Sequence, residues 1–88
     1  MTIERIHSGV GYLRGKARYA PGKKDVVPGA DKETAYWILS GRVEDAFGDS
    51  GGTLSEIYEE VTEPLGLTAE DTFRLVKSAE VSGYLKVV

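Results

Sequence analysis

The sequence of 88 residues contains no cysteine, which excludes disulfide bridges, thiolate metal sites and a cysteine nucleophile. It contains a single histidine, His7, so a zinc or iron site would lack its usual imidazole ligands. No apolar run approaches the ~20 residues of a membrane-spanning helix, and the N-terminus lacks the basic-then-apolar order of a signal peptide. We therefore expect one cytoplasmic domain, residues 1–88, that makes no contact with a membrane.

Lysine and arginine are absent from a long acidic stretch. Between Glu44 and Asp71 lie nine carboxylates and no basic residue, whereas the first 24 residues carry six basic side chains and one acid, Glu4. The net charge of −3 conceals this segregation. Because like charges this close repel one another, the acidic stretch needs solvent, the basic N-terminal segment or a bound cation to offset the repulsion.

The first third of the chain has the pattern of β-strands. Residues 12–19 alternate apolar and basic side chains, which predicts a strand with one basic face. Residues 2–7 predict another strand, and residues 25–27 predict a short edge strand before Pro28. Residues 20–24 have the composition of a turn, which separates the strand at 12–19 from the one at 25–27. Together these segments predict N-terminal antiparallel strands.

Apolar periodicity and capping residues predict three helices, at about residues 32–47, 54–63 and 69–81. Asp31 is the expected N-cap of the first helix, and Gly48 ends it. The buried stripe expected on this helix consists of Ala35, Ile38, Leu39, Val43 and Ala46, flanked by Tyr36 and Trp37, which we also expect to pack in the core. Residues 84–88 predict a C-terminal strand that returns to the sheet, so the expected fold class is α+β.

The loop between the first two helices is a candidate cation site. Residues 45–56 join two helices in the layout of an EF-hand, and hard cations such as calcium bind six to eight oxygens in such loops. The predicted ligands are Asp45, Asp49, the Gly51 carbonyl, Thr53 and Glu56, with Glu44 as an alternative or additional ligand and with Glu59, Glu60 and Glu63 deepening the negative potential. Phe47 stands where an oxygen is wanted, so we expect weak binding, with a Kd on the order of 10⁻⁴ to 10⁻³ M.

The same residues also have a purely structural interpretation. Glu56 lies three residues after Thr53, which is the spacing of a capping box at the start of a helix. Asp49 and the glycines around it suit any loop between helices, and Glu59, Glu60 and Glu63 suit a solvated helix face. The sequence leaves the metal site and this structural role open.

The chain as a whole resembles a family of small α+β proteins of thermophilic methanogenic archaea that is linked with calcium binding through acidic loops. The resemblance rests on Met1-Thr2-Ile3-Glu4-Arg5-Ile6, on the loop from Glu44 to Gly52 and on Ser82-Gly83-Tyr84-Leu85-Lys86-Val87-Val88. It implies a cytoplasmic archaeal protein with a calcium site around Glu44, Asp45 and Asp49, and it implies no known activity.

The C-terminal half also resembles the core of a winged-helix domain, because a helix, a turn at Gly66, a second helix and a strand follow one another. Glu70 and Asp71 open the second of these helices, where a DNA-reading helix meets phosphates and base edges. We therefore expect no DNA binding through this half.

The basic strand offers a separate nucleic-acid surface. Its candidate residues are Arg14, Lys16 and Arg18, which could follow a phosphate backbone, and Tyr12, which could stack on a base. Basic side chains on one face of a strand can equally form a solvated face or guard a sheet edge.

The sequence thus predicts a non-enzymatic protein that binds calcium weakly through its acidic interhelical loop. The alternative is a winged-helix-like module that binds a protein partner, or nucleic acid through the basic strand. In either case we expect a monomer or a weak dimer.

Overall fold

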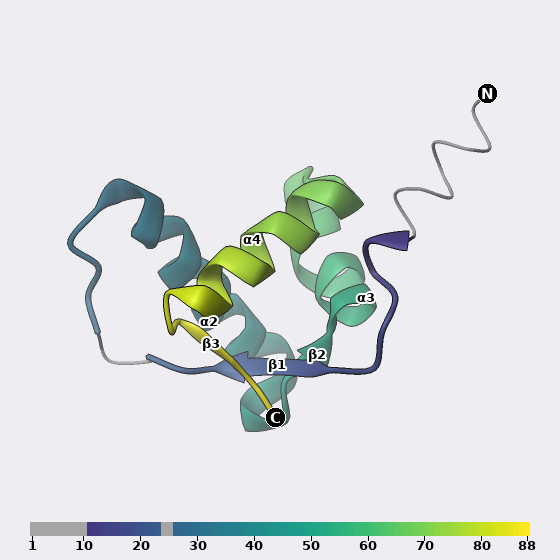
Figure 1. Cartoon of the computed structure of the whole chain (residues 1–88), viewed down its shortest axis with the longest axis horizontal. Coiled ribbons are helices and arrows are strands. Elements are labelled where there is room, and N and C mark those ends of the chain that lie inside the picture. The colour runs from purple at the N-terminus through teal and green to yellow at the C-terminus, as the bar shows by residue number, and fades with distance from the viewer. Residues whose placement is uncertain (1–10, 24–25) are drawn as a thin grey trace.

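The fold is α+β, as predicted, with one small sheet and helices that pack mainly on one of its faces (Figure 1). The computed structural model describes residues 11–23 and 26–88. Its sheet is antiparallel and has the strand order β2-β1-β3. The central strand β1 (Arg18–Pro21) pairs with β2 (Gly52–Thr53) on one side and with β3 (Leu85–Val87) on the other. The predicted return of the C-terminal strand is therefore confirmed.

The N-terminal strand predicted at 12–19 is shorter than expected and lies later in the chain. Only its last two residues belong to β1, and Gly15, with φ of +116°, interrupts the extended backbone before them. Pairing continues through Pro21, which the prediction placed in a turn, because a proline at a strand end has no ladder bond to lose. Val26 and Val27 form no strand, and the strand predicted at 2–7 lies outside the described residues.

The first and third helices have the predicted bounds. α2 (Asp31–Phe47) is preceded by Ala30 as N-cap, one residue before the expected cap, and Gly48 ends it with φ of +67°. α4 (Ala69–Val81) begins after Thr68, whose hydroxyl accepts a hydrogen bond from the Asp71 N–H at 3.1 Å. The start of α4 therefore follows from local chemistry.

The second helix begins as predicted and then changes its winding. α3 (Leu54–Ile57) opens with the capping box, in which the Thr53 N–H donates to Glu56 Oε1 at 2.9 Å and the Glu56 N–H donates to Thr53 Oγ1 at 3.2 Å. A π-helical stretch (Tyr58–Thr62) and a 3₁₀ turn (Glu63–Leu65) continue it. Pro64 lies in that turn and lacks the N–H that an α-helical bond requires.

Three residues, 66–68, join this segment to α4 in the manner of a helix-turn-helix. Gly66 adopts the left-handed conformation, with φ of +89°. The fully buried hydroxyls of Thr62 and Thr72 are hydrogen-bonded to each other, and Thr72 Oγ1 also contacts the Thr68 carbonyl oxygen at 2.8 Å. A buried polar link of this kind fixes the two helices relative to each other.

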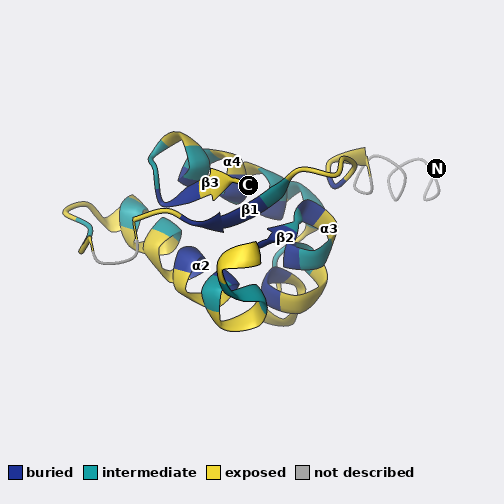
Figure 2. Ribbon diagram, turned by 90° about the horizontal axis from the view of Figure 1, so that it is seen from below, coloured by how far each residue is buried: buried dark blue, intermediate teal, exposed yellow. Residues whose placement is uncertain are grey.

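The core lies between the sheet and the helices, where the buried residues of β1 occupy the middle of the molecule (Figure 2). Its largest fully buried side chains include Tyr84, Ile57, Leu85, Val43 and Val76. The buried stripe of α2 is narrower than predicted. Leu39 and Val43 are buried, whereas Ala35, Ile38 and Ala46 are exposed, and so is Trp37.

No helix among the residues that the structure describes has the length and apolar character needed to cross a bilayer.

Ile57 and Ile38 provide a matched test of this packing. Ile57 is fully buried, so Ile57→Ala should lower the free energy of unfolding by about 2–5 kcal/mol through lost contacts and a cavity. Ile38 is 47% exposed, and Ile38→Ala should cost less than about 1 kcal/mol. Urea denaturation of the two variants measures both values, and equal losses would contradict the narrow stripe of α2.

Candidate functional site

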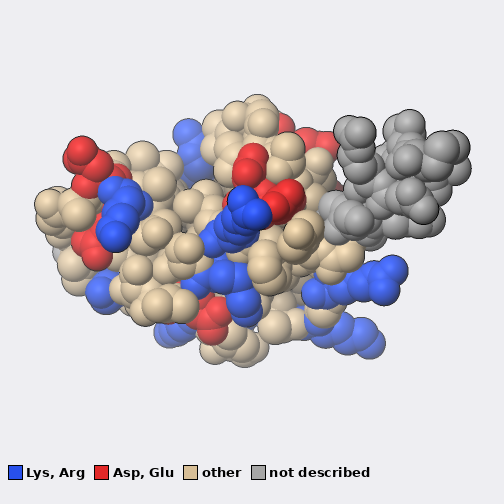
Figure 3. Space-filling model, turned by 45° about the horizontal axis from the view of Figure 1, so that its top comes forward, with Lys and Arg blue, Asp and Glu red and all other residues tan. Residues whose placement is uncertain are grey.

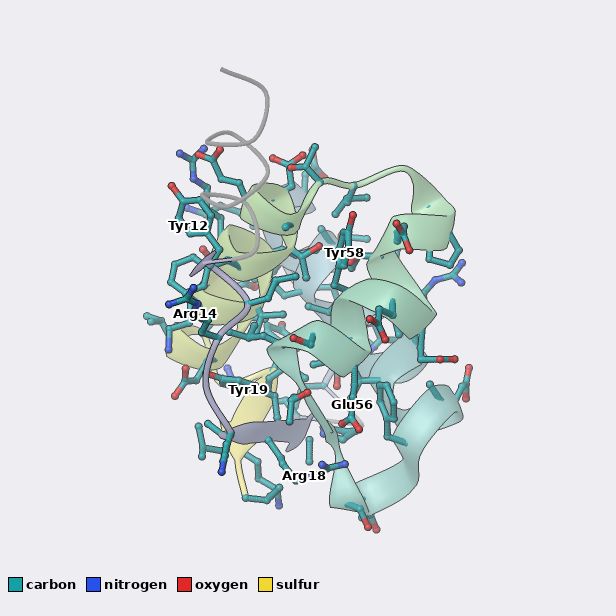
Figure 4. All side chains as sticks on the ribbon, turned by 90° about the vertical axis from the view of Figure 1, so that its right-hand side faces the viewer. Tyr12, Arg14, Arg18, Tyr19, Glu56 and Tyr58 are labelled. Carbon is teal, nitrogen blue, oxygen red and sulfur yellow. The ribbon has the colours of Figure 1, made fainter. Side chains whose placement is uncertain are left out.

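The acidic loop is fastened to the central strand by one basic side chain, Arg18. Its Nη2 atom donates to the Gly51 carbonyl at 2.7 Å and lies 3.2 Å from Glu56 Oε1, and its Nε atom donates to the Ser50 carbonyl at 3.3 Å. Figure 4 shows Arg18 and Glu56 side by side. The guanidinium thus contacts two of the groups that the sequence predicted as ligands of a cation.

Local backbone geometry brings this arginine to the loop. Arg18 is the register partner of Thr53, and Tyr19 is the partner of Gly52, so β1 runs directly beside the start of α3. Gly51 has φ of +70°, and a Cβ atom at this position would collide with the Tyr19 carbonyl. The close approach of the two chain segments therefore requires glycine at position 51.

The predicted ligands are not gathered around one point. Glu44 and Asp45 lie on α2, the exposed Asp49 lies in the 3₁₀ turn Gly48–Ser50, and Glu56 lies on α3 as the capping partner of Thr53. Within residues 11–23 and 26–88, no group of three or more histidine, aspartate or glutamate side chains is placed to hold a metal ion. The predicted capping box between Thr53 and Glu56 is confirmed by its two hydrogen bonds.

Glu59, Glu60 and Glu63, which the sequence predicted to deepen the negative potential, lie on the outside of the molecule. Glu59 and Glu60 are exposed on the π-helical stretch, and Glu63 accepts a hydrogen bond from the Tyr58 hydroxyl at 3.3 Å. Desolvation of the Tyr58 ring and the nearby Glu63 carboxylate raise the pKa of Tyr58.

The proposed basic face is divided in the structure. Arg14 and Lys16 are exposed on the segment that leads into β1, whereas Arg18 is engaged by the loop. The Tyr12 ring lies against Phe73, with 5.3 Å between ring centroids, so one of its faces is already covered. In Figure 4, Tyr12 and Arg14 lie apart from Arg18.

The basic residues of α4 are also engaged. Arg74 forms an ion pair with Glu70 one turn earlier, and Lys77 Nζ lies 3.3 Å from the Tyr19 hydroxyl and 3.5 Å from Glu80 Oε1. The hydrogen bond to Tyr19 is the main cause that raises the pKa of Lys77. The face in Figure 3 accordingly mixes basic and acidic side chains and carries no continuous basic surface.

An apolar groove lies beside α2 and was not predicted. It has a volume of about 250 Å³ and is lined by residues of α2, of the π-helical stretch, of the turn and of α4. These are Ala35, Ile38, Leu39, Val61, Leu65, Leu67 and Leu75, together with the polar residues Thr62 and Arg42. Ile38 is 47% exposed and Leu65 is 50% exposed. The sequence indicated this groove only through the apolar stripe predicted on α2, which is wider than the part of α2 that is buried.

Two further hollows adjoin the groove along α2. One shares Ile38 with it and is also lined by Trp37, Gly41 and Glu44. The other shares Arg42, Val61 and Leu65 with it and is also lined by Asp45 and Glu60. Glu44, Asp45 and Glu60, which the sequence predicted around a metal loop, line these two hollows.

No protein-family model, no curated protein and no solved structure matches this chain. The resemblance to an archaeal calcium-binding family therefore stays a prediction.

The contact of Arg18 with the loop can be measured as stability. Arg18→Met keeps the apolar stem and removes the guanidinium, which should lower the free energy of unfolding by about 1–2 kcal/mol through the lost charged hydrogen bond to Gly51 and the half-exposed ion pair to Glu56. Arg14→Met, at an exposed position four residues earlier, should change it by less than about 0.5 kcal/mol. A loss for Arg18→Met no larger than for its control, in thermal or urea unfolding, would contradict the contact.

Proposed function

We propose that this protein is a non-enzymatic interaction module with a winged-helix-like arrangement, and that it binds a protein partner through the apolar groove beside α2. The observation that carries the proposal is the groove itself. Its lining is almost entirely aliphatic, and it stays open to solvent although Ile38 and Leu65 border it. Covering such side chains removes apolar area from water, which drives most protein association.

The order of elements supports the winged-helix-like part of the proposal. α2, β2, the segment from α3 to Leu65, α4 and β3 follow one another as helix, strand, helix, helix and strand. The central strand of the sheet, β1, precedes all of these elements in the chain. The charges of α4 favour a protein partner over DNA, because its first turn carries Glu70 and Asp71 and its arginine is paired.

Weak calcium binding stays a prediction, and the contacts of Arg18 oppose it. The Gly51 carbonyl and the Glu56 carboxylate already contact a guanidinium, and the other predicted ligands lie on separate elements. A divalent ion at this loop would have to compete with Arg18 for both groups. The nucleic-acid alternative has Arg14 and Lys16 as exposed residues and lacks Arg18.

A neutral amphipathic peptide tests the groove. The peptide would have about 18 residues, leucines at i, i+3, i+4 and i+7, and glutamine at the polar positions. Trp37 is the single tryptophan and lines a hollow next to the groove, so its fluorescence should change on binding, and amide NMR should shift residues that line the groove.

Ile38→Asp should weaken this peptide at least about tenfold, because burying an isoleucine contributes about 1.5–3 kcal/mol and 1.4 kcal/mol is tenfold. The matched control is Val81→Asp, since Val81 is an 89% exposed residue of α4 that does not line the groove. Equal effects of the two variants, or amide shifts confined to residues outside the groove, would contradict the proposal.

A further inference from the structure

The groove has the form that accepts a helix. The groove shares Ile38 with one adjoining hollow and Arg42 with the other, and together the three follow α2 from Ala35 to Ala46. At about 1.5 Å per residue, this is about 17 Å of helix, or about three turns. Side chains at i, i+3 or i+4, and i+7 of a docked helix span about 10 Å, which fits within this length and is the usual geometry of helix-in-groove recognition.

Addition of a strand to the sheet is a poorer alternative. The two edges of the described sheet are β2, with two residues, and β3, with three. An added strand gains its affinity from main-chain hydrogen bonds along an edge, and these edges offer few.

The charges that border the groove specify the polar face of the docked helix. Glu44, Asp45 and Glu60 line the two hollows along α2, where Arg42 is the one cation among the described residues. The hollow that shares Leu67 and Leu75 with the groove adds one acid and one base, Asp71 and Arg74. Asp45 and Glu60 are exposed to solvent. Lysine or arginine on either side of an apolar stripe would therefore meet carboxylates, while acidic residues there would meet like charges.

A second copy of this chain fits the same surface less well. Face-to-face pairing would bring the carboxylates of one copy towards those of the other, with a single arginine on each to compensate. Each copy also carries a net charge of −3, so the long-range interaction is repulsive as well.

We infer that the groove beside α2 is a receptor for a basic amphipathic helix of a partner protein. This inference rests on the proposed function and adds the conformation and the charge of the element that is bound. The apolar stripe of the partner would cover Ile38 and Leu65, and its basic residues would lie near Asp45 and Glu60.

Three peptides of identical apolar sequence test the inference on the full chain: the neutral glutamine peptide, a form with lysines at the positions flanking the leucines, and a form with glutamates there. Trp37 fluorescence gives the affinities and amide NMR gives the site. The lysine peptide should bind about fivefold tighter than the neutral one at low salt, the glutamate peptide should bind more weakly, and the difference should shrink as salt is raised. In the double variant Asp45→Lys, Glu60→Lys the order of the charged peptides should reverse, whereas Asp31→Lys, Glu33→Lys, at the far end of α2, should leave it unchanged.

The possible failures separate the inference from the proposed function. Equal binding of all three peptides in the groove, or preference for the glutamate peptide, overturns the basic partner and leaves the groove as a binding site. Concentration-dependent dimerisation of the protein alone, abolished by Ile38→Asp in sedimentation, overturns the inference in favour of a second copy. If no peptide shifts the amide signals of groove residues and the protein does not dimerise, both the inference and the proposed function are overturned.

Discussion

The contact between the Arg18 guanidinium and the loop at residues 50–56 is the constraint on which the arrangement of this molecule depends. The loop presents two carbonyl oxygens and the Glu56 carboxylate to one cationic side chain of the central strand. This contact holds β2 beside β1 in the register that the backbone pairing sets, and it lies next to the capping box at which α3 begins. α3 in turn leads into the turn and α4. It also neutralises part of an acidic stretch that has no basic residue of its own. Of the three ways to offset the repulsion, the N-terminal basic segment is the one that the described contacts display.

Much of the fold could be predicted from local chemistry. The helix bounds follow from Gly48, from the capping boxes at Thr53 and Thr68 and from Gly66, because each of these residues satisfies or ends a backbone hydrogen-bond pattern within a few positions. The strands were predicted less well, since β1 and β2 are set by pairing between residues more than thirty positions apart. The two residues of β2 carry no periodicity that could reveal them. The change to π-helical winding after Ile57 has no signal in the sequence that we can identify.

The groove beside α2, which we propose as the binding surface, was the hardest part to predict, and the reason is physical. A carboxylate three residues after a threonine satisfies a helix cap and an EF-hand ligand pattern equally well, and only the position of Arg18 distinguishes them. Likewise, an apolar residue at a helical spacing can be buried in the core or exposed at the border of a groove, and the neighbours Ile38, 47% exposed, and Leu39, 3% exposed, have opposite outcomes. The predicted site residues Glu44, Asp45 and Glu60 did come to lie near a common surface, but that surface is apolar and the carboxylates border it. The acidic stretch of the sequence therefore contributes carboxylates to the border of the groove that we propose as a protein-binding surface.

The cationic group of Arg18 contacts the loop that would otherwise attract a divalent ion. The most direct test is an amide NMR titration of the unmodified protein with calcium, to about 10⁻² M, which is tenfold above the weakest Kd expected from the sequence. We expect small amide shifts that are distributed over residues with exposed carboxylates in general and that do not saturate. Selective, saturable shifts of residues 44–60, with the largest at Gly51 and Glu56, would mean that the ion displaces the guanidinium, and they would contradict this expectation.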